Sequence, residues 1–388
     1  MTDEQALRLH EKTPGKITVE GTVPLESQDD LEKAYTPGVA AAVDAIDADP
    51  SSVYRYTAKG RMAAVISDGS AVLGLGDVGP EAAIPVMEGK ALLLQELGAV
   101  SAFPILLDET DQENLFETAK KLHPMFGFMM VEDIASPGCF RLEQELKDEL
   151  DIPVMHDDQH GAAIAVLGAL ENALAIVEKD IEEIEVVVVG AGAAGIATGK
   201  LLDAAGVDDL WMVDRPGILT PEMDDINWAQ RDIAALTNPD CREGELADAV
   251  AGADVLIGLS APGIVSQEMV ESMAEDPIVF PLANPRPEIS ADDARAAGAA
   301  VVGTGRSGAD NQINNVLVFP GVARGLLESR ATDLTTEMKL AAADALASCG
   351  EPAKGSIVPS PLNKSLHDRI AEAVADAARD EGVVHEQE

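Results

Sequence analysis

Short, continuously apolar runs alternate along the chain with longer segments whose apolar residues recur at helical spacing. The runs typical of buried parallel strands lie at 103–108, 126–131, 185–189, 210–213 and 277–281, and all but the last are followed directly by a polar or glycine residue. The helical segments include Ala82–Leu97 and the apolar stretch that begins at His160. This alternation predicts an α/β protein with a doubly wound parallel sheet.

The first 76 residues and the C-terminal part of the chain depart from this alternation. Residues 1–34 are polar and predict little helix, after which a proline-glycine turn at 35–38 opens an Ala-rich helix. Residues 63–76 predict a β-hairpin around Asp68-Gly69-Ser70. Toward the C-terminus, apolar spacing predicts two helices, 335–348 and 365–379.

The most informative stretch is the strand and turn EVVVVGAGAAG followed by an Ala-rich helix. Its Gly190-x-Gly192-x-x-Gly195 pattern is typical of a dinucleotide site: the first glycine permits a sharp turn, the second a close approach of a pyrophosphate, and the third close packing of helix on strand. The intervening Ala191, Ala193 and Ala194 belong to the same predicted cofactor-binding turn. A glycine-rich turn also occurs for purely structural reasons, so the residues that follow it matter.

The next apolar run ends in Asp214, nineteen positions after Gly195, where a carboxylate can accept hydrogen bonds from an adenosine ribose. The adjacent Arg215 can instead accommodate a 2′-phosphate. Both NAD and NADP therefore stay open as cofactors.

Two strands that we expect to be neighbours end in pairs of acidic residues. One delivers Glu132 and Asp133, and the next delivers Asp157 and Asp158. Carboxylates gathered in one crevice repel one another unless a hard divalent cation such as Mg²⁺ or Mn²⁺ binds them. The alternative is that they are ordinary surface acids, which this chain has in abundance.

Three further residue types have both a structural and a functional interpretation. Lys90 lies in an apolar helical segment, where a lysine normally reaches out to solvent but, if desolvated, serves as a base. Tyr35 precedes the turn at 35–38, and from the sequence alone a half-buried packing role is the simpler interpretation. His156 and His160 have helical spacing for zinc, but no further ligands at suitable spacing complete a tetrahedral site.

The net charge limits the partners and the solvent conditions that suit the protein. The chain has 69 acidic and 27 basic residues, a net charge of −42, and the acids are scattered through its length. Such a surface repels nucleic acids and anionic membranes, which argues against either as a partner. It also repels itself unless salt screens it, so we expect a halophilic protein.

Cysteine usage and the N-terminus bear on location. Three dispersed cysteines are too few for a disulfide framework, and the first residues lack the pattern of a signal peptide. No apolar run appears long enough in sequence to span a bilayer. We expect a soluble cytoplasmic protein.

Taken together, the motifs resemble those of malic enzymes, specifically the short prokaryotic form. They are YTPGVA, SDGSAVLGLGDVGPEAAIPVMEGKALLLQ, VEDIASPG, PVMHDDQHGAA, VVVGAGAAG, NPRPE and NQINNVLVFPGVARG, and the resemblance covers about residues 15–385. It implies a metal- and NAD(P)-dependent enzyme that oxidises L-malate and decarboxylates it to pyruvate and CO₂ through oxaloacetate and enolpyruvate. It also implies a homodimer or larger homo-oligomer.

The resemblance implies roles for the catalytic and metal-binding residues. Lys90 would bind malate and take the proton from its C2 hydroxyl, which requires an amine kept neutral by desolvation and a nearby cation. Tyr35 would protonate C3 of enolpyruvate, and Asp157 would tune Lys90. The Mg²⁺ or Mn²⁺ ligands would be Glu132, Asp133 and Asp158.

Three asparagines complete the predicted site. Asn315 matches the malate-binding amide of the family, with Asn314 as its alternative, and Asn284 lies at the nicotinamide end. The corresponding domains are a substrate and metal domain at 1–160, a Rossmann-type NAD(P) domain at 161–330, and C-terminal helices at 331–388 that pack back on the catalytic domain.

One position departs from the family. Long animal-type malic enzymes have a carboxylate-binding arginine just before LGLGD, where this chain has Ala71. Ser70, backbone donors near Gly38 or a partner subunit would have to replace it. Two other functions keep the nucleotide fold: an amino-acid or hydroxy-acid dehydrogenase that needs no metal and releases no CO₂, and a non-catalytic NAD-binding regulator.

Overall fold

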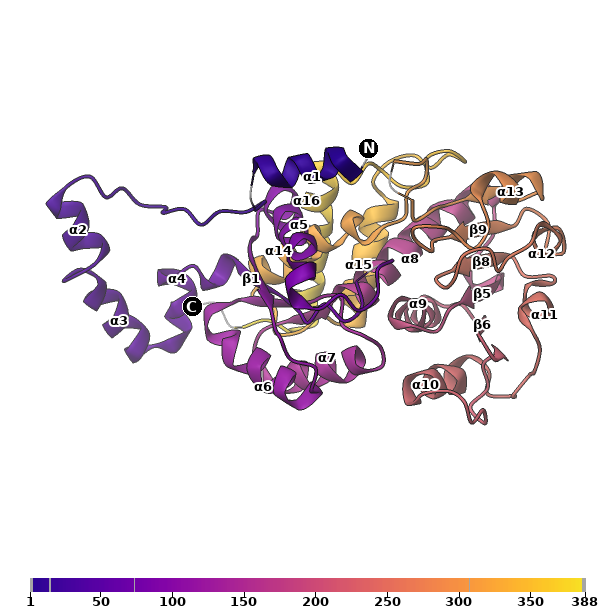
Figure 1. The fold of residues 1–388 in the computed structure, drawn as a ribbon, viewed down its shortest axis with the longest axis horizontal. Helices are drawn as coiled ribbons and strands as arrows, with labels where there is room; N and C mark the ends of the chain where they lie inside the picture. The colour runs from indigo at the N-terminus through magenta and orange to yellow at the C-terminus, as the bar shows by residue number, and fades with distance from the viewer. Residues whose placement is uncertain (1–2, 14, 73, 307, 386–388) are drawn as a thin grey trace.

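The computed structural model describes residues 3–13, 15–72, 74–306 and 308–385, which form two parallel-type sheets connected and covered by helices (Figure 1). This architecture confirms the predicted α/β class with a catalytic part and a Rossmann-type nucleotide part. The two sheets lie side by side along the long axis, and the long helix α8 (Asp157–Val177) runs between them (Figure 1).

The first sheet has four parallel strands in the order β2-β1-β3-β4. Their bounds are β1 Met62–Ser67, β2 Ser101–Leu106, β3 Phe128–Val131 and β4 Val154–His156. Helices α5 (Pro80–Gly98), α6 (Gln112–Leu122) and α7 (Gly138–Glu149) connect them. Strand β3 is buried throughout because helices cover both faces of the sheet, which explains its unbroken apolar sequence.

The predicted hairpin at 63–76 is wrong for the described residues. Strand β1 pairs in parallel with β2 on one side and β3 on the other, so it has no free edge for a hairpin partner. Residues 71–76, of which Leu73 lies outside the described residues, contribute only a bridge between Val72 and Gly76. Gly74 and Gly76 both have positive φ, which an extended strand does not accommodate.

The second sheet has the order β10-β9-β8-β5-β6-β7 and is parallel except for β7 at one edge. The strands are β5 Glu185–Val189, β6 Asp209–Asp214, β7 Gly217–Ile218, β8 Val255–Gly258, β9 Ile278–Pro281 and β10 Val301–Val302. The chain reverses its direction of progress at β5, which places a ligand-binding crevice beyond the carboxyl ends of β5 and β8.

Helices flank the second sheet, and α8 packs against α9 beside it. The helices are α9 Ala193–Ala204, α10 Trp228–Thr237, α11 Leu246–Val250, α12 Gln267–Glu271 and α13 Ala291–Ala296. By length and composition, α8 would be able to cross a membrane, contrary to our expectation from the sequence. However, 67% of its most apolar window is buried inside the protein, as expected of a core helix.

The C-terminal helices pack against the first part of the chain. Helices α14 (Phe319–Ser329) and α16 (Lys364–Asp380) contact each other and α5, whereas α15 (Thr336–Ala347) contacts α8 and α16. The predicted apolar face of the last helix is buried, with Leu366, Ile370 and Val374 fully enclosed. Short 3₁₀ helices lie at η1 Pro50–Ser52, η2 Lys59–Arg61, η3 His123–Met125, η4 Ile181–Glu183 and η5 Asn315–Leu317.

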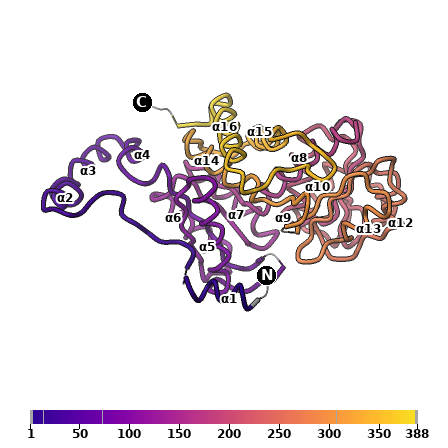
Figure 2. Tube along the Cα trace, turned by 90° about the horizontal axis from the view of Figure 1, so that it is seen from above, coloured from indigo at the N-terminus to yellow at the C-terminus, as the bar shows by residue number. Residues whose placement is uncertain are grey.

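The N-terminal region contains more helix than the sequence predicted. Its helices are α1 Asp3–Lys12, α2 Gln28–Ala34, α3 Val39–Ala48 and α4 Val53–Tyr56. The prediction missed α2 because its polar composition hid a capping box between Ser27 and Asp30, which stabilises the first turn. Residues 18–57, here called the N-terminal arm, contain no buried residue and extend away from the body in both views (Figures 1 and 2).

Candidate active site

Four acidic side chains meet at the carboxyl ends of β3 and β4. Glu132 and Asp133 follow β3, and Asp157 and Asp158 form the first turn of α8, three residues earlier than the predicted helix start. Carboxylate oxygens of Glu132, Asp133 and Asp158 all lie within 4.8 Å of one another. The positive end of the α8 dipole favours the two negative charges in its first turn.

Backbone geometry and hydrogen bonds fix the positions of these acids. Asp133 has φ of 51°, a left-handed conformation that Asp tolerates better than most residues. Its N–H donates to Oδ2 of Asp158 at 2.9 Å, and Nε2 of His156 lies 3.2 Å from the same oxygen. Burial disfavours ionisation of Asp158, but His156, together with the charge of Lys90 and the N–H of Asp133, outweighs this effect and lowers the pKa of the carboxyl group.

The donor set fits a divalent cation. Oε2 of Glu132 and Oδ1 of Asp157 are buried and have no hydrogen-bond partner among the described residues. Burial raises the pKa of Glu132 well above its usual range despite the opposing charge of Lys90, and burial also raises the pKa of Asp157. Unsatisfied carboxylate oxygens at close range are the ligands that Mg²⁺ and Mn²⁺ prefer.

Lys90 does not reach solvent, so the simpler interpretation of this residue is wrong. Its side chain is buried, with Nζ 2.6 Å from Asp157 Oδ2 and 2.7 Å from Glu132 Oε1. The ammonium also lies 4.4 Å from the centre of the Phe319 ring, a cation–π contact.

The protonation state of Lys90 differs from the one that the sequence suggested. Burial by itself lowers the pKa of Lys90, but the charges of Asp157 and Glu132 outweigh burial and raise it above its usual range. The amine is therefore a protonated ion-pair partner of the two carboxylates. The sequence suggested that Asp157 tunes Lys90, but it did not show that Glu132 also contacts the amine or that the two carboxylates together raise its pKa.

Of the two predicted amides, Asn315 reaches this cluster. Its Nδ2 donates to Asp157 Oδ2 at 2.6 Å. The side chain of Asn314 instead accepts a hydrogen bond from Val316 N at 3.0 Å and caps η5. The geometry therefore favours Asn315 over Asn314 as the group that faces the acidic site.

Tyr35 does not lie in the acidic site of its own chain. It connects α2 and α3 in the N-terminal arm and is 67% exposed, so the half-buried packing role is also wrong. The arm stands apart from α5, which carries Lys90, in both views (Figures 1 and 2). Gly38 is exposed in the same arm.

The hydroxyl group of Ser70 takes part in a hydrogen bond within the protein. Its hydroxyl oxygen accepts a hydrogen bond from Ala135 N at 3.0 Å, which holds the loop after Asp133. The backbone N–H of Ala71 donates to the carbonyl of Asp133 at 2.9 Å. Ser70 and Ala71 therefore hold the loop that carries Asp133 in place through these two hydrogen bonds.

The glycine-rich turn has the geometry that a dinucleotide requires. Gly190 has φ of 104° and follows β5, and a Cβ atom on Gly195 would lie 1.7 Å from the Gly190 carbonyl oxygen. A Cβ on Gly192 would meet no protein atom within 4 Å, so only a ligand would require its absence. Ala193 and Ala194 open α9 with their N–H groups at the helix start, which suits a pyrophosphate.

Asp214 is fixed beside this turn at the end of β6. Its Oδ2 accepts hydrogen bonds from Ala191 N at 2.9 Å and from Gln230 Nε2 at 3.2 Å. Arg215 is exposed next to it. Asn284, after β9, donates through Nδ2 to the carbonyls of Leu282 and Gly305 at 3.3 and 3.1 Å.

The sequence did not predict the buried hydrogen-bond network around Glu143, which holds the segment that carries His156 and Asp158. Glu143 of α7 is buried and accepts hydrogen bonds from His156 N and Gln159 Nε2, both at 2.8 Å. His160 Nε2 lies 2.9 Å from Glu143 Oε1, so both histidines considered for zinc face carboxylates instead. In a sequence crowded with surface acids, only burial distinguishes Glu143 from its neighbours.

Two family models match the chain. "Malic enzyme, N-terminal domain" matches residues 14–147, and "Malic enzyme, NAD binding domain" matches residues 159–379. The first match contains Lys90, Glu132 and Asp133, and the second contains the glycine-rich turn and Asn315.

Individual relatives agree. The chain is 49% identical over 384 residues to the bifunctional malic/malolactic enzyme of Bacillus subtilis, covering 98% of this chain and 94% of the relative. It is 51% identical over 372 residues to the NAD-dependent malic enzyme of Geobacillus stearothermophilus, covering 95% and 78%. The crystal structure of malic enzyme from Pyrococcus horikoshii superposes with a TM-score of 0.96 at 47% identity, covering 100% of this chain and 93% of that one.

Proposed function

The chain belongs to the malic enzyme family, and we propose from this that it catalyses the oxidative decarboxylation of L-malate to pyruvate and CO₂ with reduction of NAD or NADP. The observation that carries the proposal is the buried amine of Lys90 held between Asp157 and Glu132, beside Asp133 and Asp158. A non-catalytic NAD-binding protein would have no chemical use for a buried lysine between buried carboxylates.

Lys90 is the base in this proposal. Its amine is positioned by Asp157 and Phe319, and once deprotonated it accepts the proton of the malate C2 hydroxyl as hydride leaves C2 for the nicotinamide. Asp157 and Asn315, which share a hydrogen bond, orient Lys90 and the substrate. Asn284 stands at the nicotinamide end of the crevice.

Glu132, Asp133 and Asp158 would hold Mg²⁺ or Mn²⁺. When bound, the ion supplies Lewis-acid polarisation of the malate oxygens and neutralises negative charge that now favours the protonated form of Lys90. Asp133 N and His156 keep Asp158 in place for this role.

Tyr35 is the acid that protonates C3 of enolpyruvate, and it acts from a second copy of the chain. Its exposed position in an arm without a buried residue supports this arrangement, because such an arm gains stability only by packing on another surface. Val39 and Val43 of the same arm are 41% and 58% exposed. The active form is accordingly a homodimer or larger homo-oligomer, and the neighbouring arm also offers backbone donors near Gly38 for a substrate carboxylate.

The nucleotide binds at Gly190–Gly195 with its adenosine ribose at Asp214. A fixed carboxylate repels a 2′-phosphate, and the exposed Arg215 only partly compensates, so NAD is the preferred cofactor. The working division is a substrate and metal domain at 1–160, a nucleotide domain at 161–330, and C-terminal helices at 331–388, of which residues 386–388 lie outside the described residues.

The protein functions in a salt-rich cytoplasm. Its net charge of −42 produces self-repulsion that concentrated KCl screens, since the screening length is about 3 Å at 1 M salt. The melting temperature should therefore rise between low and molar KCl. A melting temperature that stays constant or falls would exclude the halophilic assignment without affecting the proposed reaction.

The reaction is tested by following NAD(P)H and pyruvate together, with malate and Mn²⁺ in molar KCl. We expect equal amounts of the two products. A metal-independent dehydrogenase would form NADH without CO₂ or pyruvate, and a non-catalytic regulator would form neither. Either of these results with both cofactors would refute the proposal.

A further inference from the structure

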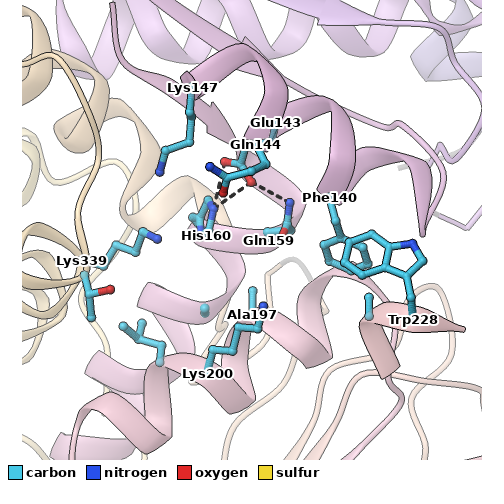
Figure 3. Close-up of a pocket in the computed structure, with 14 residues that line it drawn as sticks. Phe140, Glu143, Gln144, Lys147, Gln159, His160, Ala197, Lys200, Trp228 and Lys339 are labelled. Atoms are coloured by element: carbon cyan, nitrogen blue, oxygen red, sulfur yellow. Dashed lines mark hydrogen bonds and ion pairs between the residues drawn. The ribbon is translucent and has the colours of Figure 1, made fainter. Parts of the chain in front are cut away.

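A cavity open to solvent, separate from the acidic site, is lined by α7, α8, α9, α10 and α15 (Figure 3). Its volume is about 300 Å³, at the lower end of the range for small-molecule sites. None of the carboxylates at the ends of β3 and β4 lines it, and neither do the glycine-rich turn and Asp214. We call it the rear cavity.

Three lysines from three different helices line the rear cavity. Lys147 comes from α7, Lys200 from α9 and Lys339 from α15, and Figure 3 shows them around the same space. The whole chain has 27 basic residues against 69 acidic ones, so three lysines at one small cavity is an unusual local excess of positive charge.

Most of this positive charge is not neutralised by the protein. Lys147 is paired with Asp333 at 2.8 Å. Within the described parts of the chain, Lys200 and Lys339 have neither an ion pair nor a side-chain hydrogen bond. The carboxylate that lines the cavity, Glu143, is engaged by His156 N, Gln159 and His160.

The environment of Lys339 shows the energetic cost of leaving it unpaired. The pKa of Lys339 is lowered to about 8, chiefly by burial and also by the charges of Lys147 and Lys200, against the opposing charges of Glu143 and Asp333. A buried ammonium without a partner is unfavourable, and an anion placed beside it removes that penalty.

We propose that the rear cavity binds a small multivalent anion, a phosphate ester or a polycarboxylate, between Lys200 and Lys339. Lys147 borders the same charged end. The opposite end carries the apolar rings of Phe140 and Trp228, packed edge to face at 6.0 Å, which suits a carbon skeleton attached to the anionic groups. The size of the cavity admits a metabolite and excludes a polymer.

The proposal is tested by isothermal titration of the full-length protein, freed of divalent metal with EDTA because the probes chelate metals. Sodium pyrophosphate and citrate are titrated separately, with the same KCl concentration in cell and syringe. We expect one saturable site per chain for at least one probe, and the probe that binds identifies phosphate or carboxylate as the recognised group. Saturating NADH should not displace it, because the cavity lies outside the predicted cofactor turn.

Three variants make the test specific. Lys200→Gln and Lys339→Met should each weaken binding at least tenfold, and melting curves establish that both variants are folded. The matched control is Lys121→Gln, which removes an exposed lysine of α6 far from the cavity and should leave binding unchanged. Absence of saturable binding by both probes, equal affinity in all four proteins, or displacement by NADH would overturn the proposal.

Proton uptake provides a second readout. With a pKa of about 8, Lys339 is partly neutral at pH 8, and a bound anion would raise this pKa so that the side chain takes up a proton from the buffer. Titrations in two buffers of different ionisation enthalpy should therefore reveal uptake of up to about half a proton per anion. This uptake should disappear in Lys339→Met, and its persistence there would show that another group responds to the anion.

Discussion

The Nδ2 atom of Asn315 lies 2.6 Å from Oδ2 of Asp157, the same oxygen that contacts the ammonium of Lys90. Three elements, α5, α8 and η5, thereby meet at one carboxylate oxygen. Because Asp157 is fully buried, it cannot be solvated by water and depends on these two donors. The following predictions test the site built around this junction.

Replacement of Lys90 tests the base. Lys90→Arg keeps a positive charge beside Asp157 and Glu132, but arginine does not release its proton at accessible pH. Malate oxidation should fall by about 10²–10⁴-fold, the range for loss of a general base. Initial rates provide the measurement, with an unchanged melting temperature as evidence of folding, and near-normal turnover would remove Lys90 from this role.

Complementation tests whether Tyr35 acts across subunits. Tyr35→Phe and Lys90→Arg should each be deficient in pyruvate formation, and Tyr35→Phe should retain some oxaloacetate reduction. If the active site combines Lys90 of one copy with Tyr35 of another, co-expressed variants recover about a quarter of wild-type activity by random pairing in a dimer. Activity no greater than the sum of the two variants would place Tyr35 and Lys90 in the same copy.

Removal of one carboxylate tests the metal site. Asp158→Asn should weaken Mn²⁺ binding at least tenfold, because a charged ligand is lost from a set of three. Asp148→Asn, which alters an exposed acid of α7, should bind Mn²⁺ as the wild type does. EDTA should abolish activity and Mn²⁺ should restore it. Equal Mn²⁺ affinity in all three proteins would mean that the acids are not ligands.

Parallel kinetics with the two nucleotides test cofactor choice. The carboxylate of Asp214 should give a kcat/KM at least about tenfold higher with NAD than with NADP, a difference of about 1.4 kcal/mol. Asp214→Ser should reduce the ratio of kcat/KM with NAD to kcat/KM with NADP, whereas Arg215→Ala should leave kcat/KM with NAD unchanged. A wild-type preference for NADP would show that Arg215 dominates the ribose end.

Glu171 gives a pH-dependent prediction away from the active site. Burial raises the pKa of this α8 residue from 4.5 to about 7, with a smaller effect from Asp344 of α15. Because the folded-state pKa is the higher one, the protonated carboxyl stabilises the fold below about pH 4.5, and this contribution is lost as pH rises through about 7.

Glu171→Gln is neutral at every pH and should therefore melt higher than the wild type at pH 8 but not near pH 5. The expected increase is about 1–2 °C, since domains of 150–250 residues gain roughly 2–4 °C per kcal/mol and a longer chain gains less. Glu337→Gln, on the exposed side of α15, is the control and should give no pH-dependent difference. An identical difference at both pH values would contradict the assigned titration.

Much of the fold follows from local sequence. Parallel strand β3 is uniformly apolar, and β5 is apolar after Glu185, because both faces of each sheet are covered. The turn at Gly190–Gly195 requires glycine where backbone atoms nearly touch. The acidic pairs were predicted to converge because the carboxyl ends of adjacent parallel strands share one edge of the sheet. Each of these features depends on neighbours in sequence or on a general rule of sheet topology.

Features that depend on distant neighbours required the tertiary structure. The missing hairpin at 63–76 reflects the occupation of both edges of β1 by β2 and β3. The raised pKa of Lys90 arises from carboxylates 42 and 67 positions away, and the buried role of Glu143 is invisible among so many surface acids. Periodicity and spacing determine which residues face a core or end a strand, whereas electrostatics depends on distances between side chains, and those distances exist only after the chain has folded.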